Sequence, residues 1–129
     1  MLSEVSKMEK LKLERRRLLE RELSLVVERL KTEYAPKQII LFGSLAKGDT
    51  HEWSDIDLVI IKDTDKEFLD RLEEAVLIAK PEVGINLLVY TPEEFKEMIE
   101  EGNHFITEEI VEKGKVLYIE QEEKISKMA

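Results

Sequence analysis

The chain of 129 residues contains no cysteine, which excludes disulfide bonds, thiolate metal sites and cysteine nucleophiles. It also lacks an excess of positive charge. Its 29 acidic residues outnumber 20 basic ones, and the net charge of −9 argues against general binding of DNA or RNA. No apolar run is long enough to span a membrane, and the polar residues Met1–Lys10 include no signal-peptide core. We therefore expect a cytoplasmic protein without a membrane segment.

Proline and glycine are scarce, so the few that occur mark boundaries between elements. Lys10–Glu33 contains neither and is dominated by strong helix formers, which predicts a long helix that ends before Pro36. The charged first half carries a basic cluster, Arg15–Arg17, which we interpret as a solvated helix face. The alternative is an arm that contacts a partner or a second copy. Apolar residues at helical spacing should pack on a sheet: Leu19, Leu23, Val26, Val27, Leu30 and Tyr34.

Two short apolar runs in the middle of the chain predict strands that flank a polar loop. The first, Ile39–Phe42, is ended by Gly43, and the second, Asp55–Ile61, begins with two aspartates. Because side chains alternate along a strand, Asp55 and Asp57 should share a face, with Cα atoms about 7 Å apart. Two carboxylates at that separation can converge on a metal ion, and oxygen ligands favour Mg²⁺.

The turn after the first strand has the composition of an anion-binding site. Gly43 permits a close backbone approach, and Ser44 is predicted to be a helix N-cap, where free N–H groups attract an anion. Lys47 could add a positive charge for a phosphate. Simpler interpretations exist for both side chains. We favour phosphate contact over a plain cap for Ser44, and for Lys47 we leave phosphate contact and simple solvation open.

Together these segments carry a resemblance to a known family. Gly43-Ser44, Lys47-Gly48 and Ser54-Asp55-x-Asp57-Leu58, each attached to a strand, resemble the signature of polymerase-β-like nucleotidyltransferases. The resemblance is strongest to the minimal nucleotidyltransferases, which often pair with HEPN-domain proteins as toxin–antitoxin systems, and it extends over Tyr34–Ile119. It implies an α/β (α+β) fold, in which helices pack on a mixed sheet of about four strands after a long N-terminal helix.

The remaining sequence fits that fold and suggests its boundaries. We expect an N-terminal helix or arm at residues 1–33, a nucleotidyltransferase domain at 34–120 and a frayed tail at 121–129. The helix over Lys66–Lys80, capped by Asp63 or Asp65, should bury an apolar face of Phe68, Leu69, Leu72, Val76 and Ala79. Further elements are a strand at Val83–Tyr90, a helix capped by Thr91, a helix at His104–Lys113 and an edge strand at Lys115–Glu120.

The resemblance implies a reaction and assigns residues to it. The reaction is Mg²⁺-dependent transfer of a nucleoside monophosphate from an NTP, which we expect to be ATP, to a hydroxyl acceptor. Asp55 and Asp57 would hold the metal, and Gly43, Ser44 and Lys47 would bind the nucleotide. Because no acceptor-binding module is evident, we expect the acceptor hydroxyl on a HEPN-type partner protein. A homo-oligomer formed through the N-terminal helix is a further expectation.

One position departs from the family pattern. The family places a third, catalytic carboxylate on the strand after the Asp-x-Asp motif, and Asn86 occupies that position here. An amide can ligate a metal weakly, but it cannot act as a general base, so turnover is more in question than nucleotide binding. The alternatives are a catalytically weak or inactive nucleotide-binding antitoxin that acts by contact, and a purely structural acidic domain. Asn86 could also be a hydrogen-bonded residue at a bulge beside Gly84.

Overall fold

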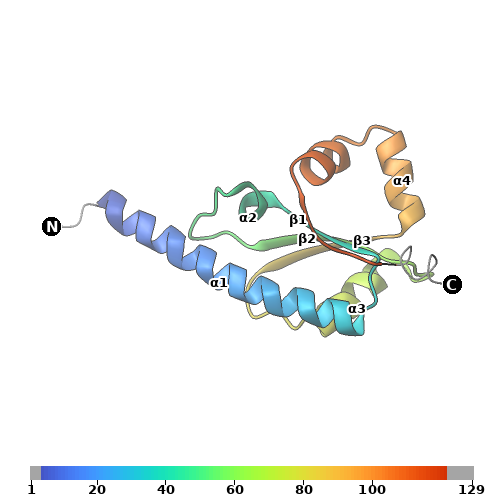
Figure 1. Cartoon of the computed structure of the whole chain (residues 1–129), viewed down its shortest axis with the longest axis horizontal. Coiled ribbons are helices and arrows are strands. Elements are labelled where there is room, and N and C mark those ends of the chain that lie inside the picture. Colours follow the sequence, from blue (N-terminus) through green and yellow to red (C-terminus); the bar gives the residue numbers. More distant parts are fainter. Residues whose placement is uncertain (1–3, 122–129) are drawn as a thin grey trace.

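A four-stranded sheet forms the centre of the structure, a computed structural model that describes residues 4–121 (Figure 1). The tail expected at residues 121–129 lies, apart from its first residue, outside the described residues. In chain order the elements are α1 (Glu4–Glu33), β1 (Gln38–Phe42), α2 (Gly43–Lys47), β2 (Ile56–Ile61), α3 (Phe68–Ala79), β3 (Ile85–Tyr90), α4 (Pro92–Glu100), the π-helix η1 (Phe105–Glu112) and β4 (Lys115–Ile119).

The sheet is mixed, with strand order β3-β2-β1-β4. β1 runs antiparallel to both β2 and β4, whereas β2 and β3 are parallel and are joined by α3 as the crossover that parallel strands require. The predicted mixed sheet, the long N-terminal helix and the edge position of the last strand are confirmed. Within residues 4–121, no helix combines the length and the apolar character that a membrane span requires.

The long helix α1 packs along one face of the sheet beside α3 (Figure 1). It begins at Glu4, earlier than the predicted Lys10, and it ends where Ala35 adopts a positive φ of 52° before Pro36. The predicted apolar stripe is confirmed, since its residues are buried in the core or packed against it: Leu19, Val26, Leu30 and Tyr34 are buried, and Leu23 and Val27 are partly buried.

A second, smaller core lies on the opposite face of the sheet, under α4 and η1. Ile40 and Val59 of the sheet pack there with Ile106 and Ile110 of η1. The predicted start of α4 is confirmed, because Thr91 is the N-cap and forms a reciprocal capping box with Glu94. The helix predicted at His104–Lys113 is present, but it is a π-helix over Phe105–Glu112.

The buried face of α3 agrees with the predicted one in part, since Ala79 is buried and Leu72 packs against the core. The side chains of Leu69 and Val76 are 75% and 41% exposed, whereas Arg71 and Ala75 are buried. Arg71, a charged residue that the apolar pattern did not include, therefore belongs to the buried face. The N-cap of α3 is Glu67, so neither Asp63 nor Asp65 caps it as expected.

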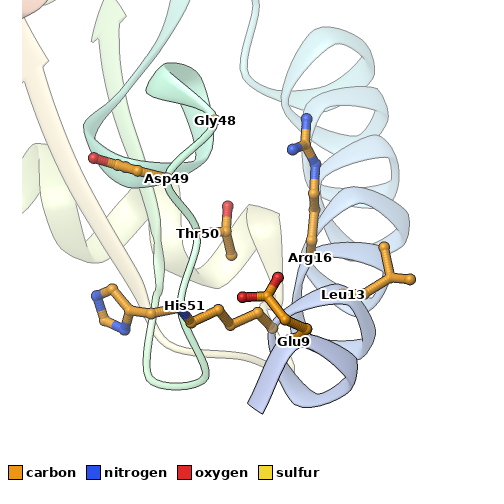
Figure 2. Close-up of a pocket in the computed structure, with 8 residues that line it drawn as sticks. Glu9, Leu13, Arg16, Gly48, Asp49, Thr50 and His51 are labelled. Atoms are coloured by element: carbon orange, nitrogen blue, oxygen red, sulfur yellow. The ribbon is translucent and has the colours of Figure 1, made fainter. Parts of the chain in front are cut away.

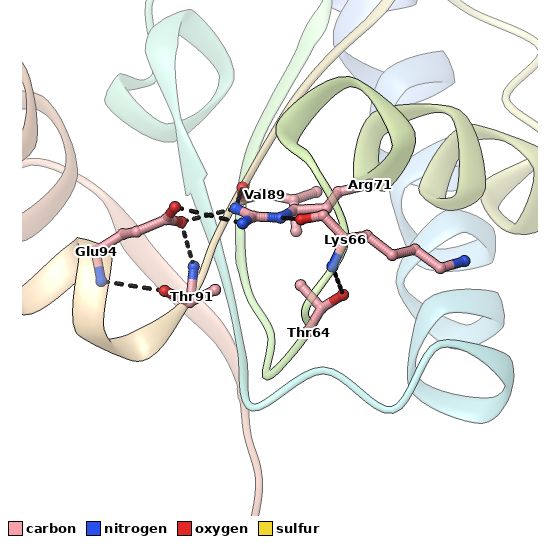
Figure 3. Close-up of polar contacts among 6 residues, drawn as sticks. All are labelled: Thr64, Lys66, Arg71, Val89, Thr91 and Glu94. Atoms are coloured by element: carbon pink, nitrogen blue, oxygen red, sulfur yellow. Dashed lines mark hydrogen bonds and ion pairs between the residues drawn. The ribbon is translucent and has the colours of Figure 1, made fainter.

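Arg71 ties α3 to the strand and the helix that follow it (Figure 3). Its guanidinium donates to the carbonyl oxygens of Lys66, at 2.7 Å, and Val89, at 3.2 Å. Two further bonds, of 2.7 and 3.3 Å, reach the carboxylate of Glu94. The hydrogen bond from Arg71 is the main reason why the pKa of Glu94 is lowered. The chain therefore buries an arginine by satisfying it on several sides.

Candidate active site

Segments from three strands meet at one end of the sheet and bring most of the predicted site residues together. Phe42, the last residue of β1, lies opposite Asp57 of β2, and Asp57 lies opposite Asn86 of β3. Asp55 immediately precedes β2, and the turn at Gly43 immediately follows β1. The turn, both aspartates and Asn86 therefore form one cluster, as the spacing of the motif predicted.

Two glycines let the aspartate side chains lie directly against the backbone. Gly43 has a φ of 75°, and a Cβ atom at this position would lie 2.2 Å from Oδ2 of Asp57. A Cβ atom on Gly84 would lie 2.3 Å from Oδ1 of Asp55. At either position, an added Cβ would require the aspartate carboxylate to move. The sequence prediction included Gly43 in the site but missed the close approach of Gly84 to Asp55.

Gly43→Ala should disturb the site more than the strain of its backbone explains. We expect it to cost about 1–3 kcal/mol of stability and to weaken metal and nucleotide binding, because the methyl group displaces the Asp57 carboxylate. Gly48→Ala is the matched control, since Gly48 has a φ of 80° and a methyl group there would meet no atom within 4 Å. Thermal unfolding and ligand titration of both variants make the comparison. Equal losses of ligand affinity in the two variants would contradict the role of the Gly43–Asp57 contact.

Ser44 links the turn to the loop before β2 instead of capping α2. The N-cap of α2 is Phe42 and the helix begins at Gly43, so the prediction of Ser44 as the N-cap was wrong. With Phe42 as the N-cap, the helix begins two residues earlier than a cap at Ser44 would place it. The Ser44 hydroxyl donates to Oγ of Ser54 at 2.9 Å, and the same oxygen accepts from the backbone N–H of His51. These bonds hold the loop that leads into Asp55 against α2.

Asn86 donates from Nδ2 to Oδ1 of Asp57 at 2.7 Å. The pairing of β2 with β3 is regular over the whole strand, so the interpretation of Asn86 as a bulge residue was wrong, although it is hydrogen-bonded. Burial raises the pKa of Asp57, the hydrogen bond from Asn86 opposes that rise, and the charge of Asp55 adds to it. The two carboxylates thus form a partly desolvated negative site that favours a cation.

Lys47 and Arg15, two basic residues of elements beside the cluster, have different partners. Lys47, a predicted nucleotide ligand, forms an ion pair with Glu109 of η1 at 2.8 Å, and that hydrogen bond raises the pKa of Lys47. Arg15 of α1 reaches the cluster itself, with Nη2 lying 3.5 Å from Oδ1 of Asp55. Our sequence prediction placed Arg15 on a solvated face. A signal was present, since Arg15 precedes Leu19 by four residues and so extends the buried stripe of α1 by one turn.

The N-terminal half of α1 also forms one wall of a groove beside the loop between α2 and β2 (Figure 2). The groove has a volume of about 370 Å³, and its lining includes charged residues from both walls. Figure 2 shows α1 on one side and the loop with Asp49, Thr50 and His51 on the other. Its lining residues are Glu9, Lys12, Leu13, Arg16, Gly48, Asp49, Thr50 and His51.

The oxygen atoms that could ligate a metal at Asp55 and Asp57 suit one kind of metal ion. Among the described residues, no group of three or more histidine, cysteine, aspartate or glutamate side chains could enclose a metal. The cluster instead offers two carboxylates and one amide oxygen from Asn86. Such a small, oxygen-only set fits Mg²⁺, which keeps several waters and completes its coordination with substrate phosphates.

Comparisons with known proteins agree with this geometry. The family model described as a nucleotidyltransferase domain matches residues 23–129. A protein of Methanocaldococcus jannaschii that bears the name "putative protein adenylyltransferase" is 40% identical over 94 residues, which are 71% of this chain and 90% of that protein. A crystal structure of a "putative nucleotidyltransferase" from Sulfolobus solfataricus has a TM-score of 0.60 at 16% identity, covers 87% of this chain and 90% of its own, and shares the fold.

Proposed function

This chain belongs to the nucleotidyltransferase domain family and is a nucleotidyltransferase, and we propose that it moves AMP from Mg-ATP to a hydroxyl acceptor. The family supports an NTP substrate and a divalent metal. The observation that carries the assignment to these residues is the pairing of Asp55 and Asp57 against the glycine turn at the end of the sheet. The choice of magnesium and of ATP is part of the proposal.

In this proposal each residue of the cluster has a defined task. Asp55 and Asp57 hold the cation, and a bound Mg²⁺ supplies charge neutralisation and lowers the pKa of the attacking hydroxyl. The backbone at Gly43 and Ser44 lies against the phosphates. The acceptor oxygen bonds to the α-phosphorus, the bond from that phosphorus to the bridging oxygen breaks, pyrophosphate leaves, and the hydroxyl proton passes to water. Asn86 orients Asp57 through its hydrogen bond but cannot accept the proton of the acceptor.

We propose a hydroxyl on a partner protein as the acceptor. The related protein of Methanocaldococcus jannaschii supports this choice by its name, which refers to adenylyl transfer to protein. A partner of HEPN type remains the expectation that the sequence resemblance raised. For α1 as a contact between two copies, the supporting observation is a row of exposed leucines at seven-residue spacing: Leu11, Leu18 and Leu25.

A second candidate function is a weak catalyst that acts on its partner mainly by contact. Asn86 favours it, because the position that carries the third carboxylate in the family here holds an amide bonded to Asp57. The two candidates share nucleotide binding and differ in turnover. A transfer assay with a candidate partner therefore separates them, while a binding assay tests what they have in common.

Binding of Mg-ATP should stabilise the fold. At a free concentration a hundredfold above its dissociation constant, the ligand should add about 2.7 kcal/mol to the free energy of unfolding. Thermal unfolding with and without Mg-ATP measures the gain, which Asp57→Ala should abolish. Asp65→Ala is the matched control, because Asp65 is an exposed aspartate outside the cluster. An unstabilised wild-type protein, or an Asp57→Ala variant stabilised as much as the wild type, would contradict the proposed site.

A further inference from the structure

Arg15 of α1 is held in a fixed place beside the two aspartates. Its Nε donates to the carbonyl oxygen of Ser54 at 2.9 Å, and its Nη2 lies 3.5 Å from Oδ1 of Asp55. The arginine side chain is 23% exposed, so most of its stem is covered while the end of the guanidinium faces the cluster. The contact joins residues that are far apart in the sequence. α1 therefore contributes directly to the site.

The charge distribution around the cluster gives this contact its significance. The whole chain carries a net charge of −9, and the cluster itself contains two carboxylates. Lys47 is paired with Glu109, and Arg16 is paired with Glu20. Among the ion pairs of the described residues, the pair with Arg15 is the one that brings a cation to either aspartate. A triphosphate with a charge near −4 would approach a negative site in which Arg15 is the cationic side chain closest to Asp55.

The guanidinium of Arg15 has enough N–H donors to bind more than one anion. Arginine presents five N–H donors in a planar fork, and the bond to Ser54 uses one of them. Because Nε anchors the group to a backbone carbonyl, its Nη groups stay at the cluster whichever anion they contact. Arg15 also lies outside residues 23–129, which the family model matches, so the family pattern does not supply it.

We propose that Arg15 is a phosphate-binding residue that also pairs with Asp55 while no divalent cation is bound. This inference rests on the proposed function, since it assumes that Asp55 takes part in holding the cation of a metal–nucleotide complex. In the ligand-free protein the guanidinium offsets the charge of Asp55. When a cation occupies the aspartates, the Nη donors become available to the triphosphate. Arg15 therefore competes with the free metal ion and cooperates with the nucleotide.

The proposal predicts that Arg15→Ala changes the affinities for Mg-ATP and for Mg²⁺ alone in opposite directions. Arg15→Ala should weaken binding of Mg-ATP by about 10- to 100-fold, the range that corresponds to charge-assisted hydrogen bonds. The same variant should bind Mg²⁺ alone up to about fivefold more tightly, because a partly exposed ion pair no longer competes for Asp55. A purely structural role of Arg15 would weaken both. Arg15→Lys keeps the charge but loses the planar set of N–H donors. Its affinity for Mg-ATP should therefore fall between that of the wild type and that of Arg15→Ala.

Calorimetric titration of the full chain with Mg²⁺, Mg-ATP and adenosine tests this inference. Arg17→Ala is the matched control, since Arg17 is an exposed arginine on the same helix and its removal changes the net charge equally. Thermal unfolding without ligand checks that each variant folds. We expect a loss for Mg-ATP in Arg15→Ala alone and no difference for adenosine, which carries no phosphate.

Each other outcome overturns a defined part of the proposal. If Arg15→Ala and Arg17→Ala lose equal affinity for Mg-ATP, the effect is general charge and Arg15 has no special role. If Arg15→Ala also loses affinity for Mg²⁺ alone or for adenosine, Arg15 acts by supporting the loop at Ser54 and not by binding phosphate. If the wild-type protein binds no Mg-ATP, the proposed function itself fails, and this inference fails with it.

Discussion

Asn86→Asp is expected to raise the rate of nucleotidyl transfer by about 10²–10⁴-fold, the usual contribution of a general base. Asn86 lies opposite Asp57 in the register of β2 and β3 and bonds to it at 2.7 Å. A carboxylate at this position would add a charged ligand for the metal and a group that can accept the proton of the acceptor hydroxyl. Affinity for the nucleotide should change little, whereas the apparent affinity for Mg²⁺ should rise.

Asn86→Asp should lower the stability of the protein without ligand. It replaces a hydrogen bond to Asp57 with a third negative charge in a cluster where burial already raises the pKa of Asp57. A raised pKa in the folded state means that stability falls as the pH rises through that pKa. Ligand-free Asn86→Asp should therefore be less stable than the wild type at neutral pH, and the difference should shrink in acid.

Labelled ATP, a candidate partner and matched Mg²⁺ concentrations are needed to measure the change in rate. Asn86→Ala is the control, since it removes the hydrogen bond to Asp57 without adding a carboxylate. It should not accelerate transfer. A wild-type rate equal to that of Asn86→Asp would show that a third carboxylate at this position is dispensable. If neither the wild type nor Asn86→Asp transfers the nucleotide, the result would favour a protein that acts on its partner by contact.

Arg71→Ala should lower the free energy of unfolding by about 2–4 kcal/mol, because a buried arginine loses its hydrogen bonds to two carbonyl groups and to a half-exposed carboxylate. Arg71 is 7% exposed and bonds to Glu94 and to the carbonyl oxygens of Lys66 and Val89. Removal leaves a cavity and two carbonyl groups without these partners. It also releases α4 from α3, because the pair with Glu94 joins the two helices. Arg17→Ala, which removes an exposed arginine, should cost less than about 0.5 kcal/mol.

The pH dependence of this loss has a definite sign. The bond from Arg71 holds the pKa of Glu94 below its ordinary value of 4.5, so its contribution to stability is present above that pH. The contribution is lost as the pH falls through the lowered pKa. Denaturant unfolding should therefore show a gap between wild type and Arg71→Ala that narrows below about pH 4.5. If the difference in free energy of unfolding between wild type and Arg71→Ala stays constant in acid, the loss comes from packing alone.

Local patterns were sufficient to predict the strands and the central motif. Asp57 lies in β2 and Asp55 immediately before it, and the turn at Gly43 directly follows β1, so both features are properties of neighbouring residues. The start of α4 was equally predictable, because Thr91 and Glu94 cap each other within one turn. The packing of α1 also followed from its helical spacing.

Features that depend on distant partners could not be predicted in this way. Arg15 belongs to the site only because α1 crosses the loop at Ser54, a contact across 39 residues. The burial of Arg71 in α3 depends on distant backbone carbonyls and on Glu94, so apolar spacing found Leu72 and Ala79 on the buried face but not Arg71. Ile106 and Ile110 indicate a helix by their spacing, but they do not distinguish an α-helix from the π-helix that forms.

The strand order also determines how the chain can fold during its synthesis. β1 can pair with β2 soon after both leave the ribosome, but its other edge pairs with β4, which is made after every other element of the sheet. Until then the nascent chain exposes an open apolar edge at Ile39 and Ile40, and η1 has only just become available to cover Ile40. The interval between synthesis of β2 and of β4 is therefore the period in which the growing chain is most open to edge-to-edge association.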